Sequence, residues 1–225
     1  MSRTVVVTGG AKGIGLATTR EFASIGDQVV ALGRDAQALA EIGGGVRTEI
    51  CDITDERAVM STFERIGDVD VLVNNAGIAE SAPLRRTTLD SWLRHLDVNV
   101  TGPFLCTRAV IESMRARRSG AVIMVASTAG RIGAPYTSAY TASKHAAVGL
   151  MRAVAAELAG TGVRVNAVCP TFVRTDLTAR AIARIVDQTG RSAEEAELAL
   201  AHQTPLGRLL EPDEVAAAVV FLASD

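Results

Sequence analysis

Short runs of consecutive apolar residues alternate along the chain with longer segments of mixed apolar and polar residues at helical spacing. Most of the short runs have the β-branched, continuously apolar character of strands that are buried on both faces of a parallel sheet. The six candidate strands are residues 5–8, 28–32, 47–51, 71–74, 121–126 and 163–168. The segments between them predict helices, so we expect a three-layer α/β/α fold with a doubly wound parallel sheet in the strand order 3-2-1-4-5-6.

The long connection after the sixth candidate strand departs from this alternation. Between residues 171 and 210 no further strand is expected, and the apolar spacing predicts two short helices, around 182–186 and over 193–202. Long connections in compact domains are often lids over a binding site, so we expect a substrate lid at about 171–210. A last helix is expected from Pro212, because proline is favoured in the first turn of a helix. No linker or repeat interrupts the chain, so residues 1–225 are expected to form a single domain.

A glycine-rich turn joins the first candidate strand to the first candidate helix. It reads Thr8-Gly9-Gly10-Ala11-Lys12-Gly13-Ile14-Gly15. Glycine lets the backbone turn tightly and approach a pyrophosphate, and the following helix offers free N–H groups and the positive end of its dipole. Strand, glycine turn and helix in this order indicate a dinucleotide-binding element, although the spacing is G-x-x-x-G-x-G rather than the commoner G-x-G-x-x-G.

Tyr140 and Lys144 are four positions apart and share one face of a predicted helix. A free phenol has a pKa of about 10 and is a poor acid–base catalyst at neutral pH. A fixed ammonium group beside it, together with a bound cationic cofactor, favours the phenolate and lowers that pKa, plausibly by ~3 units. Ser127, thirteen residues before the tyrosine, brings a hydroxyl that can orient a carbonyl or alcohol oxygen.

These motifs together resemble the short-chain dehydrogenase/reductase family. The resemblance runs from residue 4 to about 176 in the family's order and spacing, through Thr8 to Gly15, Asp52, Asn74 to Gly77, Asn99, Ser127, Tyr140, Lys144 and Asn166 to Thr175. Within the family, Ser143 to His145 and Val165 to Pro170 look most like 3-oxoacyl thioester reductases and aromatic polyketide ketoreductases. The resemblance implies a Rossmann-fold, dinucleotide-binding catalytic domain that interconverts a ketone and a secondary alcohol by hydride transfer.

The resemblance also implies four catalytic residues. Tyr140 exchanges a proton with the substrate oxygen, Lys144 holds the nicotinamide ribose and lowers the pKa of Tyr140, and Ser127 polarises the substrate oxygen. Asn99 is similar to the residue that kinks its helix and holds a water in contact with Lys144. A purely structural role for a buried asparagine is the alternative for Asn99.

The implied cofactor site draws on the ends of several strands. With Tyr140 and Lys144, it comprises Gly9, Lys12, Gly13, Ile14, Gly15, Arg34, Asp52, Ile53, Asn75, Ala76, Gly77, Pro170, Thr171, Val173 and Thr175. Asp52 is similar to the residue that meets the adenine amine, and Thr175 to the residue that contacts the carboxamide. Thr171 stands where relatives usually carry glycine, so it is either harmless in a permitted backbone region or narrows the pocket.

The end of the second strand bears on which nucleotide is bound. Gly33 stands where NAD-preferring relatives usually carry an acidic residue. Arg34 follows it, and Lys12 lies in the glycine turn; two cations near one ribose favour a 2′-phosphate. We therefore predict NADP as the cofactor. NAD is the alternative, because both cations can instead be solvated and Asp35 can still reach the ribose.

Composition narrows the function classes further. The chain has 225 residues, of which 48% are hydrophobic, and a net charge of −2, which favours neither nucleic acid nor an anionic membrane as a partner. No uncharged apolar run of 18 residues is present, so no membrane span is expected. Residues 1–3 lead directly into a strand, which leaves no room for a signal peptide.

Three cysteines and three histidines remain to be placed. Cys51, Cys106 and Cys169 have no C-x-x-C spacing and are expected to be small buried apolar residues in a reducing cytoplasm. The histidines His95, His145 and His202 are well separated and are expected to lie on the surface or in the lid. No metal site is expected.

The leading hypothesis is an NADP(H)-dependent ketoreductase acting on a 3-oxoacyl thioester or polyketide-like substrate. An NAD-dependent alcohol or 3-hydroxyacyl dehydrogenase working oxidatively is the alternative, and a non-catalytic NAD(P)-sensing module is a third hypothesis, although such modules typically lose the tyrosine or the lysine. Nucleotide-sugar epimerases and dehydratases share the Tyr-x-x-x-Lys motif but are usually longer. Three arginines of the lid are expected either to face an acyl-carrier phosphopantetheine or coenzyme A or to be solvated: Arg174, Arg180 and Arg184.

Assembly is suggested by one long predicted helix, at 137–159. Its apolar residues cover more of the circumference than one sheet face can bury. We expect a homotetramer, or at least a homodimer, through this helix and the one at 101–117. Relatives usually continue beyond the last helix into a seventh strand and a short tail, whereas the sequence given ends at Asp225.

Overall fold

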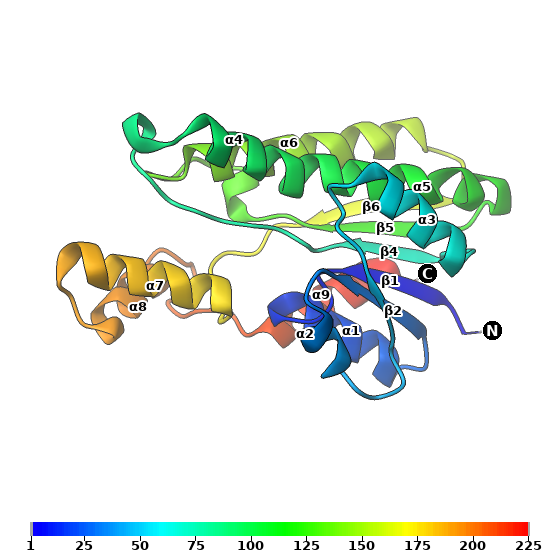
Figure 1. Ribbon diagram of the computed structural model, residues 1–225, viewed down its shortest axis with the longest axis horizontal. Coiled ribbons are helices and arrows are strands. Elements are labelled where there is room, and N and C mark those ends of the chain that lie inside the picture. The colour runs from blue at the N-terminus through cyan, green and yellow to red at the C-terminus, as the bar shows by residue number, and fades with distance from the viewer. Residues whose placement is uncertain (1, 225) are drawn as a thin grey trace.

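A parallel sheet of six valine-rich strands lies at the centre of the protein, whose residues 2–224 are described by a computed structural model (Figure 1). The strands are β1 (Thr4–Thr8), β2 (Gln28–Gly33), β3 (Arg47–Ile50), β4 (Val71–Asn74), β5 (Gly120–Val125) and β6 (Val163–Val168). Their order is β3-β2-β1-β4-β5-β6, which confirms the predicted doubly wound α/β fold. All the strand pairs are parallel, so their carboxyl ends meet at one edge of the sheet.

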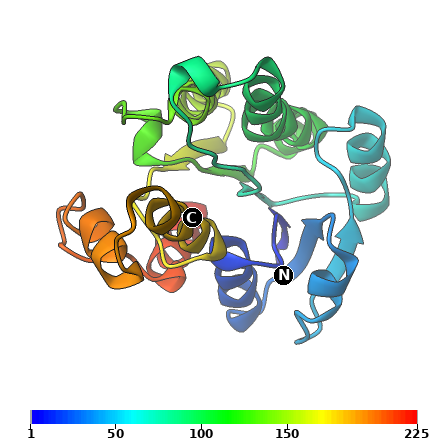
Figure 2. The same ribbon diagram turned by 60° about the vertical axis from the view of Figure 1, so that its left-hand side comes forward.

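Side chains of the central strands alternate between two apolar layers, because successive residues of a strand point to opposite faces. On one face, Val6 and Leu72 pack in a core with residues of α3 (Glu56–Ile66), α5 (Gly102–Arg117) and α6 (Ser138–Glu157). On the other face, Val5 and Val73 pack in a core with residues of α1 (Gly13–Ser24) and α9 (Pro212–Ala223). Helices therefore cover both faces of the sheet, which makes the three layers visible in Figures 1 and 2.

Short helical elements occupy the connections near the carboxyl edge of the sheet. They are α2 (Ala36–Ala40), α4 (Leu89–Leu96), the 3₁₀ turns η1 (Leu84–Arg86) and η3 (Thr128–Gly130), and the π-helical turn η2 (Asp97–Thr101). Two further helices, α7 (Asp176–Thr189) and α8 (Ala193–Ala201), extend beyond that edge (Figure 1). The connections at this edge thus surround the carboxyl ends of the strands, where doubly wound sheets bind their ligands.

The expected lid region consists of α7 and α8 and is fastened at its two ends. Val173 and Leu210 form an isolated parallel bridge, and the N–H of Arg174 donates to the carbonyl of Leu210 at 2.8 Å. Within α7, Thr178 is the one fully buried residue. Helix α7 therefore has little buried surface, whereas α8 buries Ala196, Leu200 and Ala201.

Strand β3 lies at the edge of the sheet, where the predicted strand order places it. Its charged residues and Ile50, which is 64% exposed, face water. Charged side chains on an edge strand discourage pairing with another chain. Cys51 and Cys106 are buried as expected, whereas Cys169 is only partly buried. Within residues 2–224 no helix has both the length and the apolar character needed to cross a bilayer.

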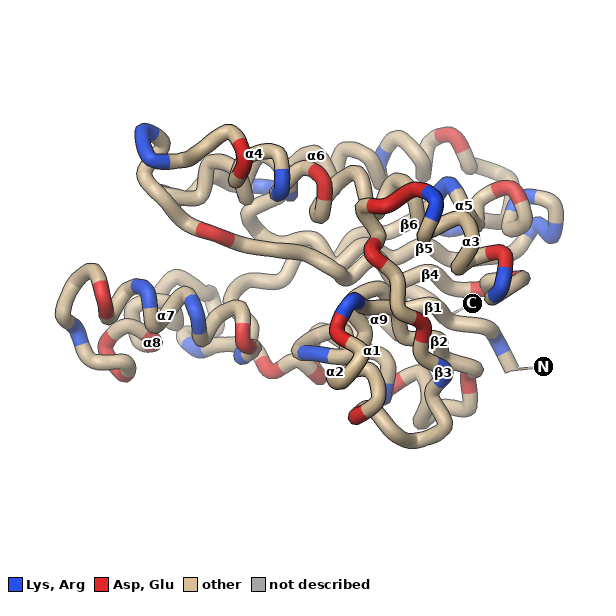
Figure 3. The backbone as a smooth tube through the Cα atoms, viewed as in Figure 1, with Lys and Arg blue, Asp and Glu red and all other residues tan. Residues whose placement is uncertain are grey.

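The distribution of charge agrees with this layering. Lysine, arginine, aspartate and glutamate lie mainly on helices, on connecting loops and on the edge strand, while the inner strands β1, β4 and β5 are almost free of them (Figure 3). Along the backbone, basic and acidic residues are interspersed on most helices and loops (Figure 3). This interspersion does not favour nucleic acid as a partner.

Candidate active site

Three strand ends and the segments that follow them converge on one crevice at the carboxyl edge of the sheet. Asn75 follows β4, Ser127 follows β5, and Pro170 follows β6. The loops are held together by backbone contacts, because the N–H of Thr128 donates to the carbonyl of Pro170 at 2.9 Å. The sequence-predicted residues are therefore brought together from segments that are far apart in the chain.

The glycine turn between β1 and α1 is compact enough to require glycine. Gly9 and Gly13 have positive φ angles of 64° and 52°. A Cβ atom on Gly15 would lie 2.1 Å from the carbonyl oxygen of Gly9, which no real side chain allows. The Asn75 amide donates to the carbonyl oxygens of Thr8 and Gly9 at 2.9 and 3.2 Å, so the end of β4 fixes the shape of the turn.

The same turn leaves hydrogen-bond donors free for an anion. Helix α1 begins after Lys12, whose side chain makes no capping hydrogen bond to the first turn, and that turn contains no acidic residue. The open N–H groups and the positive end of the helix dipole therefore suit a phosphate. Thr175 lies directly above, since a Cβ on Gly13 would meet its methyl group at 3.0 Å. A pyrophosphate fits this cradle, with the start of α7 on its outer side.

Two exposed ion pairs mark the end of β2, where the adenosine end of a nucleotide would lie. Lys12 Nζ is 2.6 Å from Asp35 Oδ2, and Arg34 Nη1 is 3.4 Å from Asp52 Oδ2. The hydrogen bond from Lys12 lowers the pKa of the Asp35 carboxyl, and Asp35 also caps α2 by accepting from the N–H of Ala38. Lys12 and Arg34 therefore both lie at the end of β2, as predicted, and each forms an ion pair with a carboxylate. Ile53, by contrast, is a core residue that packs against Gly102 of α5.

Lys144 is buried next to Tyr140 at the start of α6. Its side chain is 5% exposed, and Nζ donates to the carbonyl of Val125 at 3.2 Å and lies 5.8 Å from the centre of the Tyr140 ring. Ser127 caps η3 by accepting from the N–H of Ala129 at 3.1 Å and is hydrogen-bonded to Tyr140. Ser127, Tyr140 and Lys144 therefore form one contiguous cluster, as the sequence predicted.

Burial dominates the electrostatics of this cluster. It lowers the pKa of the Lys144 ammonium to about 8, because the charged form loses its hydration and gains only one carbonyl partner. Burial also raises the pKa of the Tyr140 phenol above its ordinary value, while the hydrogen bond with Ser127 acts in the opposite direction. The lowering of the Tyr140 pKa that was expected from Lys144 together with a bound cationic cofactor stays a prediction.

Asn99 lies in the π-helical turn η2 between α4 and α5, which agrees with the predicted kink. Its side chain is buried and pairs with the backbone of Ile78, accepting from the N–H at 2.9 Å and donating to the carbonyl at 3.0 Å. It also donates to Ser143 Oγ at 2.9 Å. A Cβ on Gly77 would lie 3.1 Å from Asn99 Oδ1 and 3.5 Å from Lys144 Nζ, so Gly77 separates the two side chains.

Comparison with known proteins identifies the family. The family model described as short chain dehydrogenase matches residues 3–185. The chain belongs to this short-chain dehydrogenase/reductase family. It is an oxidoreductase of the class that acts on CH–OH groups, and the family uses NAD(P)(H).

Relatives in the family span several substrates. The chain is 38% identical to the granaticin polyketide synthase putative ketoacyl reductase 1 of Streptomyces violaceoruber, over 98% of this chain and 86% of that protein. It is 39% identical to the cis-4-hydroxycyclohexanecarboxylate dehydrogenase of Sinomonas cyclohexanicum, over 99% and 90% of the two chains. The crystal structure of a variant of actinorhodin polyketide ketoreductase with NADPH superposes with a TM-score of 0.91 at 35% identity, covering 99% of this chain and 90% of that one.

Thr171, which replaces the family's usual glycine, has an ordinary backbone conformation. In residues 2–224 the non-glycine residues with positive φ are Arg118 and Tyr136, and Thr171 is not among them. The backbone of Thr171 therefore lies outside the left-handed region that would require glycine, in agreement with the first of the two alternatives.

One residue of the site was misjudged from the sequence. His95 was expected on the surface, but it is fully buried in α4. Its Nε2 accepts from the N–H of Glu80 at 3.1 Å, its Nδ1 is 2.7 Å from the carbonyl of Ser91, and its ring meets that of Tyr140 edge-on at 6.4 Å. A histidine in an otherwise ordinary amphipathic helix gives no sequence signal of this role. His95 links Tyr140 to the loop after β4.

Replacing Gly15 by alanine should abolish nucleotide binding, because the new Cβ would collide with the carbonyl of Gly9 and force the turn open. Titration with NADPH, followed by calorimetry, measures the effect. Gly149→Ala is the matched control, since that glycine lies on α6 with open space around it and alanine is the better helix former. Wild-type affinity in Gly15→Ala would contradict the proposed cradle.

Lys144→Met should be more stable than the wild type at pH 7, by up to about 3 kcal/mol. Burial lowers the pKa of Lys144 from 10.5 in the unfolded chain to about 8 in the folded protein. Below pH 8 the wild type must therefore bury a charged ammonium group on folding, and Lys144→Met avoids that cost in free energy. The advantage of the variant should shrink as the pH rises from about 8 to about 10.5. Urea unfolding over this pH range measures it.

Lys12→Met is the control, because Lys12 is the other lysine of the chain and is exposed. It should show no such gain. A wild type at least as stable as Lys144→Met at pH 7 would show that Lys144 is not held at an energetic cost.

Proposed function

We propose that this protein is an NADP(H)-dependent ketoreductase that interconverts a ketone and a secondary alcohol, with a 3-oxoacyl thioester or a polyketide-like ketone as its substrate. The observation that carries the proposal is the cluster of Ser127, Tyr140 and Lys144 beside a glycine cradle that admits a pyrophosphate. The relatives named as ketoacyl reductases and a polyketide ketoreductase support the substrate class. Oxidation of an alcohol with NAD is the second candidate, favoured by the relative named as a cyclohexanecarboxylate dehydrogenase.

A bound nicotinamide supplies the hydride to the carbonyl carbon, or accepts it in the reverse direction. Tyr140 donates its phenolic proton to the carbonyl oxygen during reduction. Ser127 donates a hydrogen bond to the same oxygen and stabilises the charge that develops there. Because burial raises the pKa of Tyr140, the phenol stays protonated in the free protein and is ready to act as the acid.

Lys144 has two roles in this proposal. Its ammonium group lies within reach of the Tyr140 ring and stabilises the phenolate left after proton transfer. It would also bind the hydroxyl groups of the nicotinamide ribose, exchanging its single bond to the Val125 carbonyl for better acceptors. Asn99 positions this group indirectly, by holding the loop of Ile78 and the hydroxyl of Ser143.

The preference for NADP rests on Gly33, Arg34 and Lys12. The last residue of β2 is Gly33, which carries no carboxylate, and the side chains of Arg34 and Lys12 are 67% and 56% exposed. Their ion pairs with Asp52 and Asp35 are solvated and weak, so a 2′-phosphate dianion competes well for both cations. Arg34 offers it two parallel N–H donors.

The α7–α8 unit is proposed as the substrate lid over residues 171–210. It follows the loop that would contact the nicotinamide, and its first helix, α7, buries Thr178 alone. Segments of this kind open at low energetic cost. Of the three arginines considered there, Arg174 is paired with Glu197 and Glu211, so it is engaged within the lid.

A homotetramer or homodimer is proposed for the assembly, through α5 and α6. Ala147 of α6 and Leu158, which directly follows this helix, are buried within the chain. Part of the apolar surface of α6 is therefore covered without a second copy. Phe104 of α5 remains 42% exposed and is available for contact with a second copy. A cytoplasmic location stays a prediction.

Tyr140→Phe should lose turnover by 10²-fold or more while NADPH affinity stays nearly unchanged, because general acid–base catalysis contributes about 10²–10⁴-fold. The assay is NADPH oxidation with a panel of ketones and 3-oxoacyl thioesters. Tyr136→Phe is the matched control, since it removes the hydroxyl of the other tyrosine of the chain, which lies outside the Ser127–Lys144 cluster, and keeps the ring in place. Activity above about a tenth of the wild type in Tyr140→Phe would refute Tyr140 as the acid.

Arg34→Ala should raise the KM for NADPH far more than the KM for NADH, because NADH lacks the 2′-phosphate that Arg34 would bind. Steady-state kinetics with both nucleotides measure this. Arg57→Ala, at an exposed position on α3, serves as a control for loss of a surface charge. A wild type with equal or higher kcat/KM for NADH would overturn the NADP preference in favour of NAD.

Light scattering at micromolar concentration should give a mass two or four times that of the 23.5 kDa chain. Replacing Phe104 by glutamate should reduce the mass, because a charged side chain would replace an apolar ring on the outer surface of α5. Phe221→Glu is the matched control, since Phe221 is exposed on α9, on the opposite face of the sheet. A wild-type mass near 23.5 kDa would refute the assembly.

A further inference from the structure

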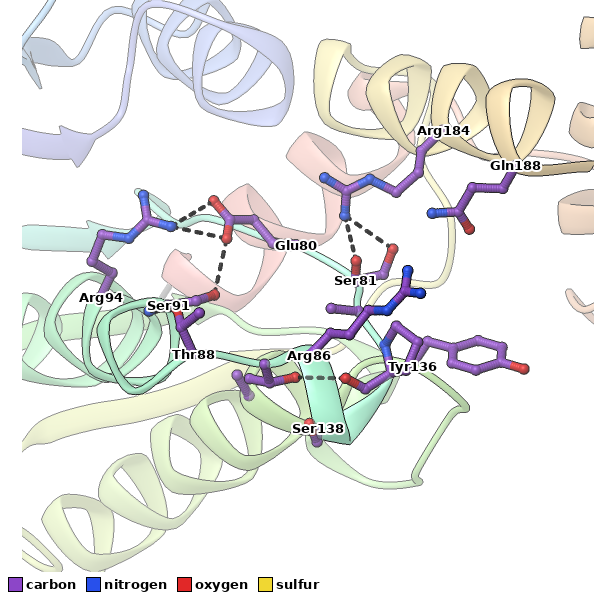
Figure 4. A pocket seen from close by; sticks show the side chains of 14 residues that line it. Glu80, Ser81, Arg86, Thr88, Ser91, Arg94, Tyr136, Ser138, Arg184 and Gln188 are labelled. Carbon is purple, nitrogen blue, oxygen red and sulfur yellow. Dashed lines mark hydrogen bonds and ion pairs between the residues drawn. The ribbon is translucent and has the colours of Figure 1, made fainter.

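A second feature of the carboxyl edge is a pocket of about 430 Å³, within the size range of small-molecule sites. Its walls come from the loop after β4, the start of α4, the segment before α6 and the outer part of α7 (Figure 4). Three arginines line it: Arg94 of α4, and Arg86 of η1 and Arg184 of α7, which come from opposite walls. None of the residues assigned above to the nucleotide lines it.

The pocket adjoins the catalytic cluster through shared residues. Ser138 and Ala139 line it and are followed directly in α6 by Tyr140. His95 connects the same places, because it accepts from the N–H of Glu80, a lining residue, and touches the Tyr140 ring. The pocket is therefore next to the catalytic cluster, on the side where the far end of a substrate held at Tyr140 would extend.

The charges that line the pocket do not balance. Glu80 accepts from Arg94 at 3.0 and 3.1 Å and from Ser91 at 3.0 Å, so its carboxylate is already paired with two residues of the same wall. Arg184 donates to the carbonyl and the hydroxyl oxygen of Ser81, which are both neutral acceptors. Arg86 lines the pocket as well, and within residues 2–224 neither Arg86 nor Arg184 forms an ion pair. Two uncompensated guanidinium groups thus face one cavity (Figure 4).

The remaining wall is shaped by a strained segment. Tyr136 has a φ of 66°, which is unfavourable for a bulky residue. Its carbonyl accepts from the N–H of Ala82 at 2.8 Å, so the loop before α6 is tied to the loop after β4. Its ring lines the pocket and is 66% exposed. Strain of this kind persists where the surrounding structure fixes it and is common at binding sites.

We propose that Arg86 and Arg184 bind an anionic group at the far end of the substrate, a carboxylate, sulfonate or phosphate, while the substrate's ketone or alcohol lies at Tyr140. This inference rests on the proposed oxidoreductase function and adds the substrate class. A guanidinium group pairs with two oxygens of such an anion at once. The bond from Arg184 to Ser81 is exchanged for the stronger, charge-assisted bonds to the anion. The same contact draws α7 towards the loop after β4.

The test compares matched ketones that differ only in charge, with NADPH as the reductant. One pair is 4-oxocyclohexanecarboxylate and its methyl ester; a second is an acetoacetyl pantetheine thioester with and without its 4′-phosphate. The two pairs separate a carboxylate on the substrate from the phosphate of an acyl carrier. In at least one pair, the anionic member should have a kcat/KM about tenfold or more above that of the neutral member, equivalent to one charge-assisted contact.

Variants assign that preference to the pocket. Arg86→Ala and Arg184→Ala should each lower kcat/KM for the anionic member by about tenfold, mainly through KM, and leave the neutral member within about twofold. Arg85→Ala is the matched control, because Arg85 is the neighbouring arginine of η1 and does not line the pocket. Equal turnover of both members of both pairs, or no effect of the two arginine variants, would overturn the anion site and leave the ketoreductase function standing.

A binding measurement covers the case in which no ketone of the panel is reduced, a result that would count against the proposed function instead. Cyclohexanecarboxylate and pantetheine 4′-phosphate are titrated against the NADPH-saturated protein by calorimetry. Binding of either anion to the wild type and to Arg85→Ala, with loss in Arg184→Ala, supports the anion site independently of turnover. Absence of binding by both anions overturns it.

Discussion

Burial of the Lys144 ammonium group is the constraint on which the arrangement of the site depends. The group has one carbonyl partner, that of Val125 at the end of β5, and burial holds its pKa near 8. Gly77 lies beside the ammonium group, and Gly130 packs against the backbone of Lys144. A Cβ on Gly77 would lie 3.5 Å from Nζ, and a Cβ on Gly130 would lie 2.8 Å from the Lys144 carbonyl. A buried ammonium group with a single hydrogen-bond acceptor gains free energy when a ligand offers it further acceptors.

A shortage of acceptors recurs at three places in the molecule. The first turn of α1 has no side-chain cap, Lys144 has one acceptor, and Arg184 bonds only to neutral oxygens. Each lies on the carboxyl side of the sheet, where the strand ends converge. Elsewhere, arginines such as Arg208 and Arg65 are paired with glutamates. These three groups lie where a dinucleotide and an anionic substrate would supply further acceptors.

Local patterns explain why much of this could be predicted from the sequence. Consecutive apolar residues in β1, β4 and β5 and the glycine turn after β1 depend on near neighbours and on steric limits that hold in any context. The positions of Ser127, Tyr140 and Lys144 follow once the strand order is known. His95 could not be predicted in this way, because its burial depends on the loop after β4 folding over it. The exposure of β3, by contrast, follows from the predicted strand order, which places it at the edge of the sheet.

The balance of charge around Tyr140 is the central claim, and a spectroscopic titration tests it most directly. The chain contains two tyrosines, so Tyr136→Phe leaves Tyr140 as the only phenol, and the near-ultraviolet absorbance of phenolate reports its pKa. Without nucleotide, burial should keep that pKa above its ordinary value. With saturating NADP⁺ it should fall by about one unit or more, and Lys144→Met should remove most of the fall. An identical titration with and without NADP⁺ would contradict the account.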